Sequence, residues 1–255
     1  MNKGKGKFSI LGNTHPAVVA VWAALHAASA LLPTIPLLGT GTSFSVGIIF
    51  APLAGVFFGP VAGAAATAVG AFIGSIIAPH TAWIGLATFV PEMFAALVAG
   101  FMSRGGKAWP LSLVIVGTGA VLWLATATGR AFPAYLFGYV LSAIAMVIGG
   151  IWGRKWLLSN KFAFQFLMIW LCSFAAMQGG STPVSTFIGV VVYGFPPELY
   201  KALLFLQPGE RAVFSLVAAI VGIPLLKGLP KVGVYVGPQD QCQDDPVVDE
   251  AMDED

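Results

Sequence analysis

Long apolar segments, separated by short breaks at Gly, Pro and charged residues, make up most of the chain. A membrane-spanning helix needs about 20 mostly apolar residues. Eight segments approach that length, and they lie at 17–38, 44–58, 61–78, 83–102, 111–128, 132–152, 162–178 and 212–226. The pattern predicts an all-α protein, a polytopic integral membrane bundle of six to eight transmembrane helices.

Two parts of the pattern leave the number of crossings open. Segments 44–58 and 61–78 are short and are joined by Gly59-Pro60, so they can form a tilted helical hairpin instead of two full crossings. The apolar run 184–192 is too short to cross and is followed by Pro196 and Pro197. We therefore expect 183–206 to form an interfacial or re-entrant cap, and eight crossings fit the pattern best.

The composition supports a membrane protein. Hydrophobic residues make up 57% of the chain and charged residues 9%, against roughly 25% charged residues in a soluble domain. A soluble protein of this size has too large a surface to cover with so few charges. The composition also excludes a disordered protein and a disulfide scaffold, since Cys172 and Cys242 are the two cysteines. No basic patch of the kind that binds nucleic acid is present in the sequence.

The basic residues predict the orientation, because loops rich in Lys and Arg stay cytoplasmic. With the N-terminus inside, ten of the 13 basic residues fall at cytoplasmic ends, and both termini are cytoplasmic. We expect a multi-pass protein of the cell membrane. It would have a basic cytoplasmic N-terminus (1–14), a membrane-embedded helical substrate-binding domain (15–231) and an acidic, disordered cytoplasmic tail (232–255). Lysines at positions 3, 5 and 7 followed by Ala28-Ser29-Ala30 imitate a signal peptide, but the apolar run continues to Leu38, which favours a retained helix.

Polar and aromatic residues gather at the predicted outer ends of the helices. Part of this set is explained by the aromatic belt that any membrane protein carries. A belt would be two-sided, however, and donors such as Gln178 and Thr126 gain little from it. The alternative is an outward-facing pocket, and its candidate residues, beside the loop 39–43, are His80, Trp83, Trp123, Thr126, Tyr139 and Gln178.

Glu92 is the most informative single residue. It falls near the middle of segment 83–102, where an ionised acid costs on the order of 2.5–3.5 kcal/mol on insertion scales. Its neighbours at helical spacing are small, so the side chain is expected to point into the bundle. Pro91 is expected to kink the helix. Glu92 then either contacts a substrate, favouring a cationic one, or is a protonated acid bonded to a neighbouring helix.

Other charged groups have local explanations. His26 is a single histidine without a nearby ligand partner in sequence, so we interpret it as a packed core residue. Arg211 could recruit an anionic group of a substrate, but snorkelling to the interface is the preferred interpretation. The sequence lacks a phosphate-binding loop, an HExxH motif, a GxSxG motif and a Cys/His cluster, so we expect no metal and no cofactor, and any energy must come from a gradient or another protein.

Small residues mark two faces where helices can approach closely. One face carries Ala20, Ala24 and Ala28 in the first segment, and the other carries Gly63, Gly70 and Gly74 in the third. Such faces are usually internal, and two of them in one chain leave room for a partner subunit.

The stretch from Ser43 to Gly47 and the run APLAGVFFGPVAG at 51–63 resemble the substrate-binding S components of energy-coupling-factor (ECF) transporters. Ala24-xxx-Ala28 and the Gly70–Gly74 segment fall at the matching places, and the ending from Pro197 to Leu226 looks like the last helix of some S components. The resemblance covers about 15–105 and 195–230.

This resemblance implies a membrane protein that binds a vitamin or related micronutrient from outside and works with a transmembrane coupling protein and two cytosolic ATPases. The small-residue positions would then be docking surfaces for the coupling protein. Binding would use Glu92 for charge, Trp83 and Trp123 for stacking, and Gln178 and Thr126 for hydrogen bonds. The alternatives are an autonomous secondary transporter, an intramembrane enzyme that uses Glu92 and a histidine as acid and base, and a purely structural membrane protein.

Overall fold

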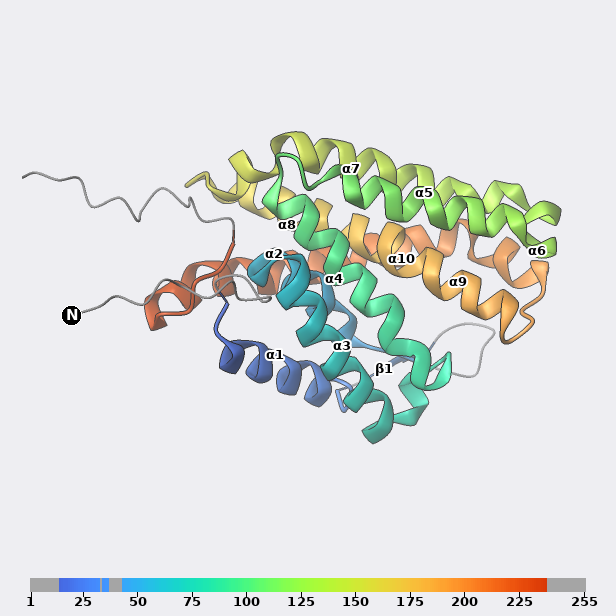
Figure 1. Cartoon of the computed structure of the whole chain (residues 1–255), viewed down its shortest axis with the longest axis horizontal. Helices are drawn as coiled ribbons and strands as arrows, with labels where there is room; N and C mark the ends of the chain where they lie inside the picture. The colour runs from blue at the N-terminus through green and yellow to red at the C-terminus, as the bar shows by residue number, and fades with distance from the viewer. Residues whose placement is uncertain (1–13, 33, 37–42, 238–255) are drawn as a thin grey trace, which may run out of the picture.

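The computed structural model describes residues 14–32, 34–36 and 43–237, and the regular structure within them is helical apart from one pair of three-residue strands (Figure 1). The helices are α1 (Pro16–Ser29), α2 (Phe50–Phe58), α3 (Pro60–Ile77), α4 (Phe89–Arg104), α5 (Pro110–Ala125), α6 (Ala127–Ala131), α7 (Leu136–Leu157), α8 (Phe162–Ala175), α9 (Thr182–Val191) and α10 (Pro197–Gly228). The strands are β1 (Thr34–Pro36) and β2 (Ser43–Ser45). The predicted helical bundle is confirmed.

Five helical stretches are long and apolar enough to cross a membrane, and they are Pro60–Ile77, Gly85–Arg104, Pro133–Leu157, Phe162–Val191 and Pro197–Val232. Three shorter apolar helices accompany them, at Pro16–Ser29, Gly47–Phe58 and Pro110–Ala125. Large apolar side chains such as Val121, Ile144 and Ile220 are more than half exposed. Such exposure suits contact with lipid tails and would be unfavourable in water.

The first apolar segment does not form one helix over 17–38, as its hydrophobicity predicted. Helix α1 ends at Ser29, and β1 pairs antiparallel with β2, with Thr34 opposite Ser45. Pro33 and Pro36 each lack the N–H that a helix continuing past Ser29 would need. The predicted polar loop 39–43 lies outside the described residues except for Ser43.

The predicted cap at 183–206 is wrong. The helix that begins at Phe162 continues through a π-helical turn, Ala176–Ser181, into α9, and α10 already begins at Pro197. The helix continues through Gly179 and Gly180, where the missing side chains allow α4 to approach closely. A Cβ at Gly180 would lie 2.8 Å from the carbonyl oxygen of Phe94. Pro208 is accommodated inside α10.

The basic ends of the helices meet at one end of the bundle. Thr14 Oγ1 donates to the carbonyl of Phe58 (3.5 Å), and Arg104 Nη1 donates to the carbonyl of Gly237 (3.3 Å). The Gly237 N–H donates to Phe57 O (2.9 Å). The start of α1, the end of α2, the end of α4 and the residues after α10 therefore share one end. The expectations for residues 1–13 and 238–255 lie outside the described residues.

Small residues hold α1 to α4 together. A Cβ at Gly63 would lie 2.6 Å from the carbonyl oxygen of Ala54, and one at Gly70 would lie 2.7 Å from that of Ala23. Gly74 packs on Ala30 in the same way, at 3.2 Å. The three glycines predicted for partner docking are thus buried in contacts between α3, α2 and α1, and that expectation is corrected.

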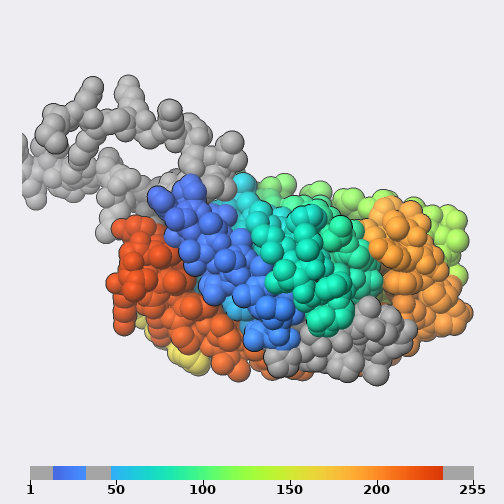
Figure 2. Space-filling view, turned by 90° about the horizontal axis from the view of Figure 1, so that it is seen from below, coloured from blue at the N-terminus to red at the C-terminus, as the bar shows by residue number. Residues whose placement is uncertain are grey.

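The alanine face of α1 behaves differently. Ala20, Ala24 and Ala28 are exposed, while Ala23 and Ala27 on the other side are buried. Figure 2 shows α1 as a blue ridge on the surface, between the red C-terminal segment and the blue-green segment that contains α3. The alanine stripe of α1 is therefore open on the outside of the molecule.

Candidate solute-binding pocket

A cavity of about 50 Å³ lies at the end of the bundle opposite the basic helix ends. Its walls come from the ends of α1 and α3, the start of α4, the start of α9 and the middle of α10. The lining residues are His26, Ser29, Ala30, Gly47, Ile48, Ala71, Gly74, Ser75, Thr81, Trp83, Thr88, Pro91, Glu92, Ser181, Ser185 and Arg211. We call it the His26–Glu92 cavity. At 10–15 Å³ for each water, it has room for about four waters.

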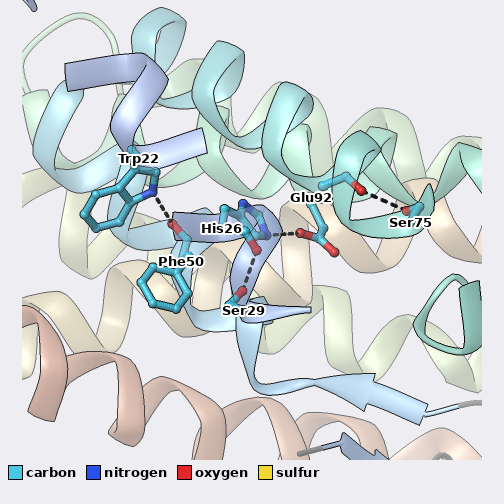
Figure 3. Close-up of polar contacts among 7 residues, drawn as sticks. Trp22, His26, Ser29, Phe50, Ser75 and Glu92 are labelled. Atoms are coloured by element: carbon cyan, nitrogen blue, oxygen red, sulfur yellow. Dashed lines mark hydrogen bonds and ion pairs between the residues drawn. The ribbon is translucent and has the colours of Figure 1, made fainter. Parts of the chain in front are cut away.

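An ionisable pair forms one wall of the cavity (Figure 3). His26 Nε2 lies 2.8 Å from Glu92 Oε2, and the two side chains are 5% and 20% exposed. The His26 ring stacks on Phe50 with centroids 6.3 Å apart, and Trp22 Nε1 donates to the Phe50 carbonyl at 3.3 Å. The Phe50 contact and the close approach of Gly70 to the His26 Cβ fix the imidazole at the cavity. His26 is therefore not only a packed core residue, as the sequence suggested.

Glu92 occupies a different part of its helix from the one expected. It lies in the first turn of α4, because α4 begins at Phe89. An acid in the first turn is stabilised by the partial positive charge of the helix N-terminus. Pro91 lies in the same turn, where its missing N–H would have no helical partner, so the predicted kink is wrong. Glu92 points toward α1 and the cavity from this helix start.

Arg211 brings a positive charge to the same cavity. Its side chain is 2% exposed and lies within electrostatic range of the adjacent Glu210 first, and then of Tyr135 and Glu92. The snorkelling interpretation is wrong because α10 begins fourteen residues earlier, at Pro197, which places Arg211 about 21 Å along the helix. The missed signal was helical continuity through Pro208.

Trp83 lies at the cavity in the loop between α3 and α4. Its ring stacks on Phe195, with centroids 6.1 Å apart and an interplanar angle of 17°, and Phe195 stacks on Tyr193 at 5.9 Å. Phe195 and Tyr193 belong to the loop between α9 and α10. Trp83 therefore packs the loop between α3 and α4 against the loop between α9 and α10. It is a predicted binding residue that lines the cavity.

Three other predicted binding residues, Trp123, Tyr139 and Gln178, lie away from the cavity. They lie in or beside a group that we call the tyrosine cluster, which consists of Trp123, Tyr135, Tyr139, Tyr200 and Gln207. The rings of Trp123, Tyr135 and Tyr200 contact one another with centroids 4.9–5.1 Å apart. Tyr135 Oη donates to Gln207 Oε1, and Tyr200 Oη donates to the carbonyl of Thr186 at 3.4 Å.

Gln178, in the π-helical turn, packs beside the tyrosine cluster against Gly138. The side chains of Gln178 and Trp123 are each 1% exposed, and neither residue lines the His26–Glu92 cavity. The structure therefore separates Trp123, Tyr139 and Gln178 from Glu92 and Trp83.

The last two predicted residues do not line the cavity. His80 is exposed in a 3₁₀ turn, Pro79–Thr81. Thr126 caps α6, because its Oγ1 accepts from Gly129 N at 2.9 Å and donates to the Trp123 carbonyl at 2.7 Å. Among the described residues, no group of three or more His, Cys, Asp and Glu is placed to hold a metal ion.

The comparisons with known proteins give a weak similarity. No protein-family model matches the chain, and no solved structure matches it. A protein of Methanocaldococcus jannaschii described as uncharacterized is 25% identical over 168 residues, which are 65% of this chain and 54% of that protein. The chain thus spans about half the length of this relative, whose name states no activity.

Proposed function

We propose that this membrane protein captures a small solute in the His26–Glu92 cavity, as the substrate-binding subunit of an ECF-type vitamin or micronutrient importer. The observation that carries the proposal is the convergence of His26, Glu92 and Arg211 on one cavity inside a bundle of apolar helices. Ionisable residues within such helices are costly and typically mark a substrate or ion path. A concave site with a few converging polar groups is the usual form of a small-molecule site.

The direction of the helices supports an outward-facing site. Residues from α1 to α4 that contact the cavity lie at the ends opposite Thr14, Phe58 and Arg104. If the basic ends are cytoplasmic, the cavity faces outside and both ends of the described chain lie inside. α1 to α5, α7, the α8–α9 helix and α10 then make eight passes of alternating direction.

The exposed alanine stripe of α1 supports docking of a transmembrane coupling protein. Small residues at four-residue spacing allow two helix backbones to approach closely in lipid. Val21 and Leu25 beside the stripe are also at least half exposed. The coupling protein would connect this subunit to two cytosolic ATPases. In this role the subunit binds the vitamin and catalyses no reaction on it.

A second candidate is an autonomous secondary transporter. Interrupted helices near a binding site are typical of such transporters, and π-helical turns often occur at functional sites. The π-helical turn Ala176–Ser181 contributes Ser181 to the cavity, and α10 contains Pro208 close to Arg211.

The test begins with protein purified in a non-ionic detergent. Molecules released on denaturation are identified by mass spectrometry, and water-soluble vitamins are screened for an increase in melting temperature. Glu92→Gln is expected to weaken binding at least tenfold, because a hydrogen bond to a charged group is worth about 1.5–3 kcal/mol. The control is Glu198→Gln, whose side chain is 73% exposed.

The outcomes separate the candidates. Unchanged binding in Glu92→Gln, or the absence of any released or stabilising solute, contradicts the capture role. Uptake by the protein alone in liposomes would favour the secondary transporter, and uptake that needs a coupling protein and ATP favours the ECF-type subunit.

A further inference from the structure

The balance of charges around the His26–Glu92 cavity depends on four residues. Arg211 has an interaction partner within the protein, and the largest electrostatic effect on its guanidinium comes from Glu210, the preceding residue of α10. Glu210 is partly buried and does not line the cavity. Since Glu210 offsets the charge of Arg211, the carboxylate of Glu92 has no matching positive charge unless His26 supplies it.

The contacts of the His26 ring favour its neutral form. One N–H is used at Nε2, which lies 2.8 Å from Glu92 Oε2. The other ring nitrogen, Nδ1, is buried and has no hydrogen-bond partner among the described residues. An imidazolium would leave a charged N–H unpaired there, which costs more free energy than the unpaired lone pair of a neutral ring. The two acids and the one arginine then leave a single negative charge, at Glu92.

The hydroxyl groups on the cavity wall act as hydrogen-bond acceptors toward a ligand. Four of them each donate their proton to a backbone carbonyl three or four residues earlier, at 2.8–3.0 Å: Ser75, Thr81, Thr88 and Ser185. A hydroxyl has one proton, so only its lone pairs remain for a ligand. Because His26 occupies Oε2 of Glu92, Oε1 remains as a charged acceptor beside them.

We infer that the cavity binds the ammonium group of a cationic solute, with its charge at Glu92 Oε1. This inference rests on the proposed capture function and identifies the part of the solute that is recognised. A primary ammonium has three N–H donors, so it can satisfy the carboxylate and the hydroxyl oxygens together. It also cancels the negative charge of Glu92, whereas an anion would lie unpaired beside that charge in a poorly solvated site.

A divalent metal ion suits the cavity less well than an ammonium group. Ca²⁺ takes about six to eight oxygen ligands, and Mg²⁺ needs an octahedral set of about six. Glu92 is the one carboxylate that lines the cavity in the described part of the chain, and no group of three or more His, Cys, Asp and Glu could hold a metal there. The single negative charge also matches a monovalent cation.

The size of the cavity limits what it encloses. A volume of about 50 Å³, which has room for about four waters, corresponds to a group of few heavy atoms. The cavity lies at the ends of α1 and α3, beside Trp83 in its loop. The rest of a longer solute can therefore extend past the Trp83 ring, while the ammonium group is enclosed.

Two compounds that differ in a single group test the inference: glycinamide carries an ammonium where glycolamide carries a hydroxyl. Glycine, the zwitterion, and sodium chloride are the comparison ligands. Each is titrated at pH 7 against the full chain in a non-ionic detergent, at an ionic strength held constant with potassium chloride, with melting temperature as the readout. The wild-type protein is expected to bind glycinamide at least about tenfold more tightly than the other three, which corresponds to 1.4 kcal/mol.

Two variants test the charge balance. Glu92→Gln is expected to bind glycinamide at least about tenfold more weakly and to lose the preference over glycolamide, because the neutral amide no longer pairs with the ammonium charge. Glu210→Gln leaves Arg211 without its adjacent counter-charge, so glycinamide should bind about threefold more weakly, while glycolamide is unaffected. Glu198→Gln, with a side chain 73% exposed, is the control and should keep the wild-type affinities. An unchanged glycinamide affinity in Glu210→Gln would overturn the charge balance and the inference with it.

The failures of the two proposals are distinguishable. A wild-type preference for glycolamide or glycine, or stabilisation by sodium as strong as by glycinamide, overturns the ammonium inference and leaves solute capture standing. If none of the four stabilises the protein, the solute released on denaturation decides: one with an ammonium group supports the inference, and one without it overturns the inference alone. Stabilisation by none and no released solute overturns both.

Discussion

The His26–Glu92 cavity and the tyrosine cluster are both polar regions among apolar helices, but they are built differently. In the cavity, an acid, a histidine and an arginine from three helices surround open space. In the tyrosine cluster, the rings of Trp123, Tyr135 and Tyr200 lie 4.9–5.1 Å apart. The hydroxyls of Tyr135 and Tyr200 are bonded within the protein, whereas the buried hydroxyl of Tyr139 has no hydrogen-bond partner there. Arg211 faces both regions, since it lines the cavity and interacts with Tyr135.

The difference shows that residue type alone does not identify a binding site in a membrane helix bundle. Aromatic pairs contribute about 0.5–1.5 kcal/mol each beyond their buried area, so the tyrosine cluster stabilises the contacts between α5, α7 and α10. Charges placed around a cavity have no such packing gain and cost solvation free energy. We therefore propose that the tyrosine cluster contributes stability and that, under the proposed function, the cavity contributes recognition.

The largest expected effect is on the packing beside the tyrosine cluster. Leucine in Gly138→Leu would collide with the amide of Gln178 and contact Pro208 Cγ, which is 3.5 Å from the Cβ position. Overpacking of this kind typically lowers the free energy of unfolding by about 1–3 kcal/mol. We expect the upper end of that range in chemical unfolding. Gly117→Leu is the matched control, because nothing lies within 4 Å of its Cβ position, and an equal loss there would contradict the assignment.

Removal of one hydroxyl in the tyrosine cluster should have a smaller effect. Tyr135→Phe takes away the hydrogen bond to Gln207 and is expected to lower the free energy of unfolding by about 1–2 kcal/mol. Ligand affinity should change less than twofold if recognition resides in the cavity. Tyr235→Phe, at a tyrosine that is 71% exposed and lies outside the cavity, is the control for both measurements. A large loss of affinity in Tyr135→Phe with unchanged stability would reverse the two roles.

Trp83→Leu addresses the cavity side of the comparison. The substitution removes the stack on Phe195, so a ligand would lose an aromatic wall worth about 0.5–1.5 kcal/mol, or roughly 2- to 12-fold in affinity. The solute used is whichever stabilises the wild type. Trp152→Leu is the control, because Trp152 is 45% exposed and lies outside the cavity. Equal effects of the two substitutions would remove Trp83 from the site.

The smallest expected effect comes from His80→Ala. Its side chain is exposed and lies in neither region. Surface substitutions usually change stability by less than 0.5 kcal/mol, and we expect affinity to change less than twofold. A loss of binding in this variant would show that the ligand extends well beyond the cavity toward the 3₁₀ turn.

The sequence predicted the class of fold because long apolar runs with few charges have few alternatives to membrane helices. It failed where proline and glycine have more than one structural role. Gly179 and Gly180 resemble helix ends in sequence but are contact points between helices, and Pro208 resembles a break but lies inside α10. Such cases depend on what packs opposite the residue, which a single sequence does not contain.

The candidate site was predictable only in part. Glu92 and Trp83 were identified because an acid or a loop tryptophan has few other roles in an apolar segment. His26 and Arg211 were given local explanations because they lie 66 and 119 residues away from Glu92 in the chain, so the sequence does not show that the three line one cavity. Trp123, Tyr139 and Gln178 were grouped with the site because local sequence cannot distinguish two polar regions at the same end of a bundle.

The unequal lengths of the helices have a consequence for the surrounding lipid. Helix α1 has 14 residues and is about 21 Å long, whereas Phe162–Val191 has 30 residues and is about 45 Å long. Acyl chains beside α1 meet an apolar surface shorter than a typical bilayer interior of about 30 Å, and a bilayer responds to such mismatch by local thinning or by tilt of the protein. We expect the bilayer to be locally thinner along the alanine stripe. The thickness of the membrane would then affect how easily a second helix displaces lipid from the stripe.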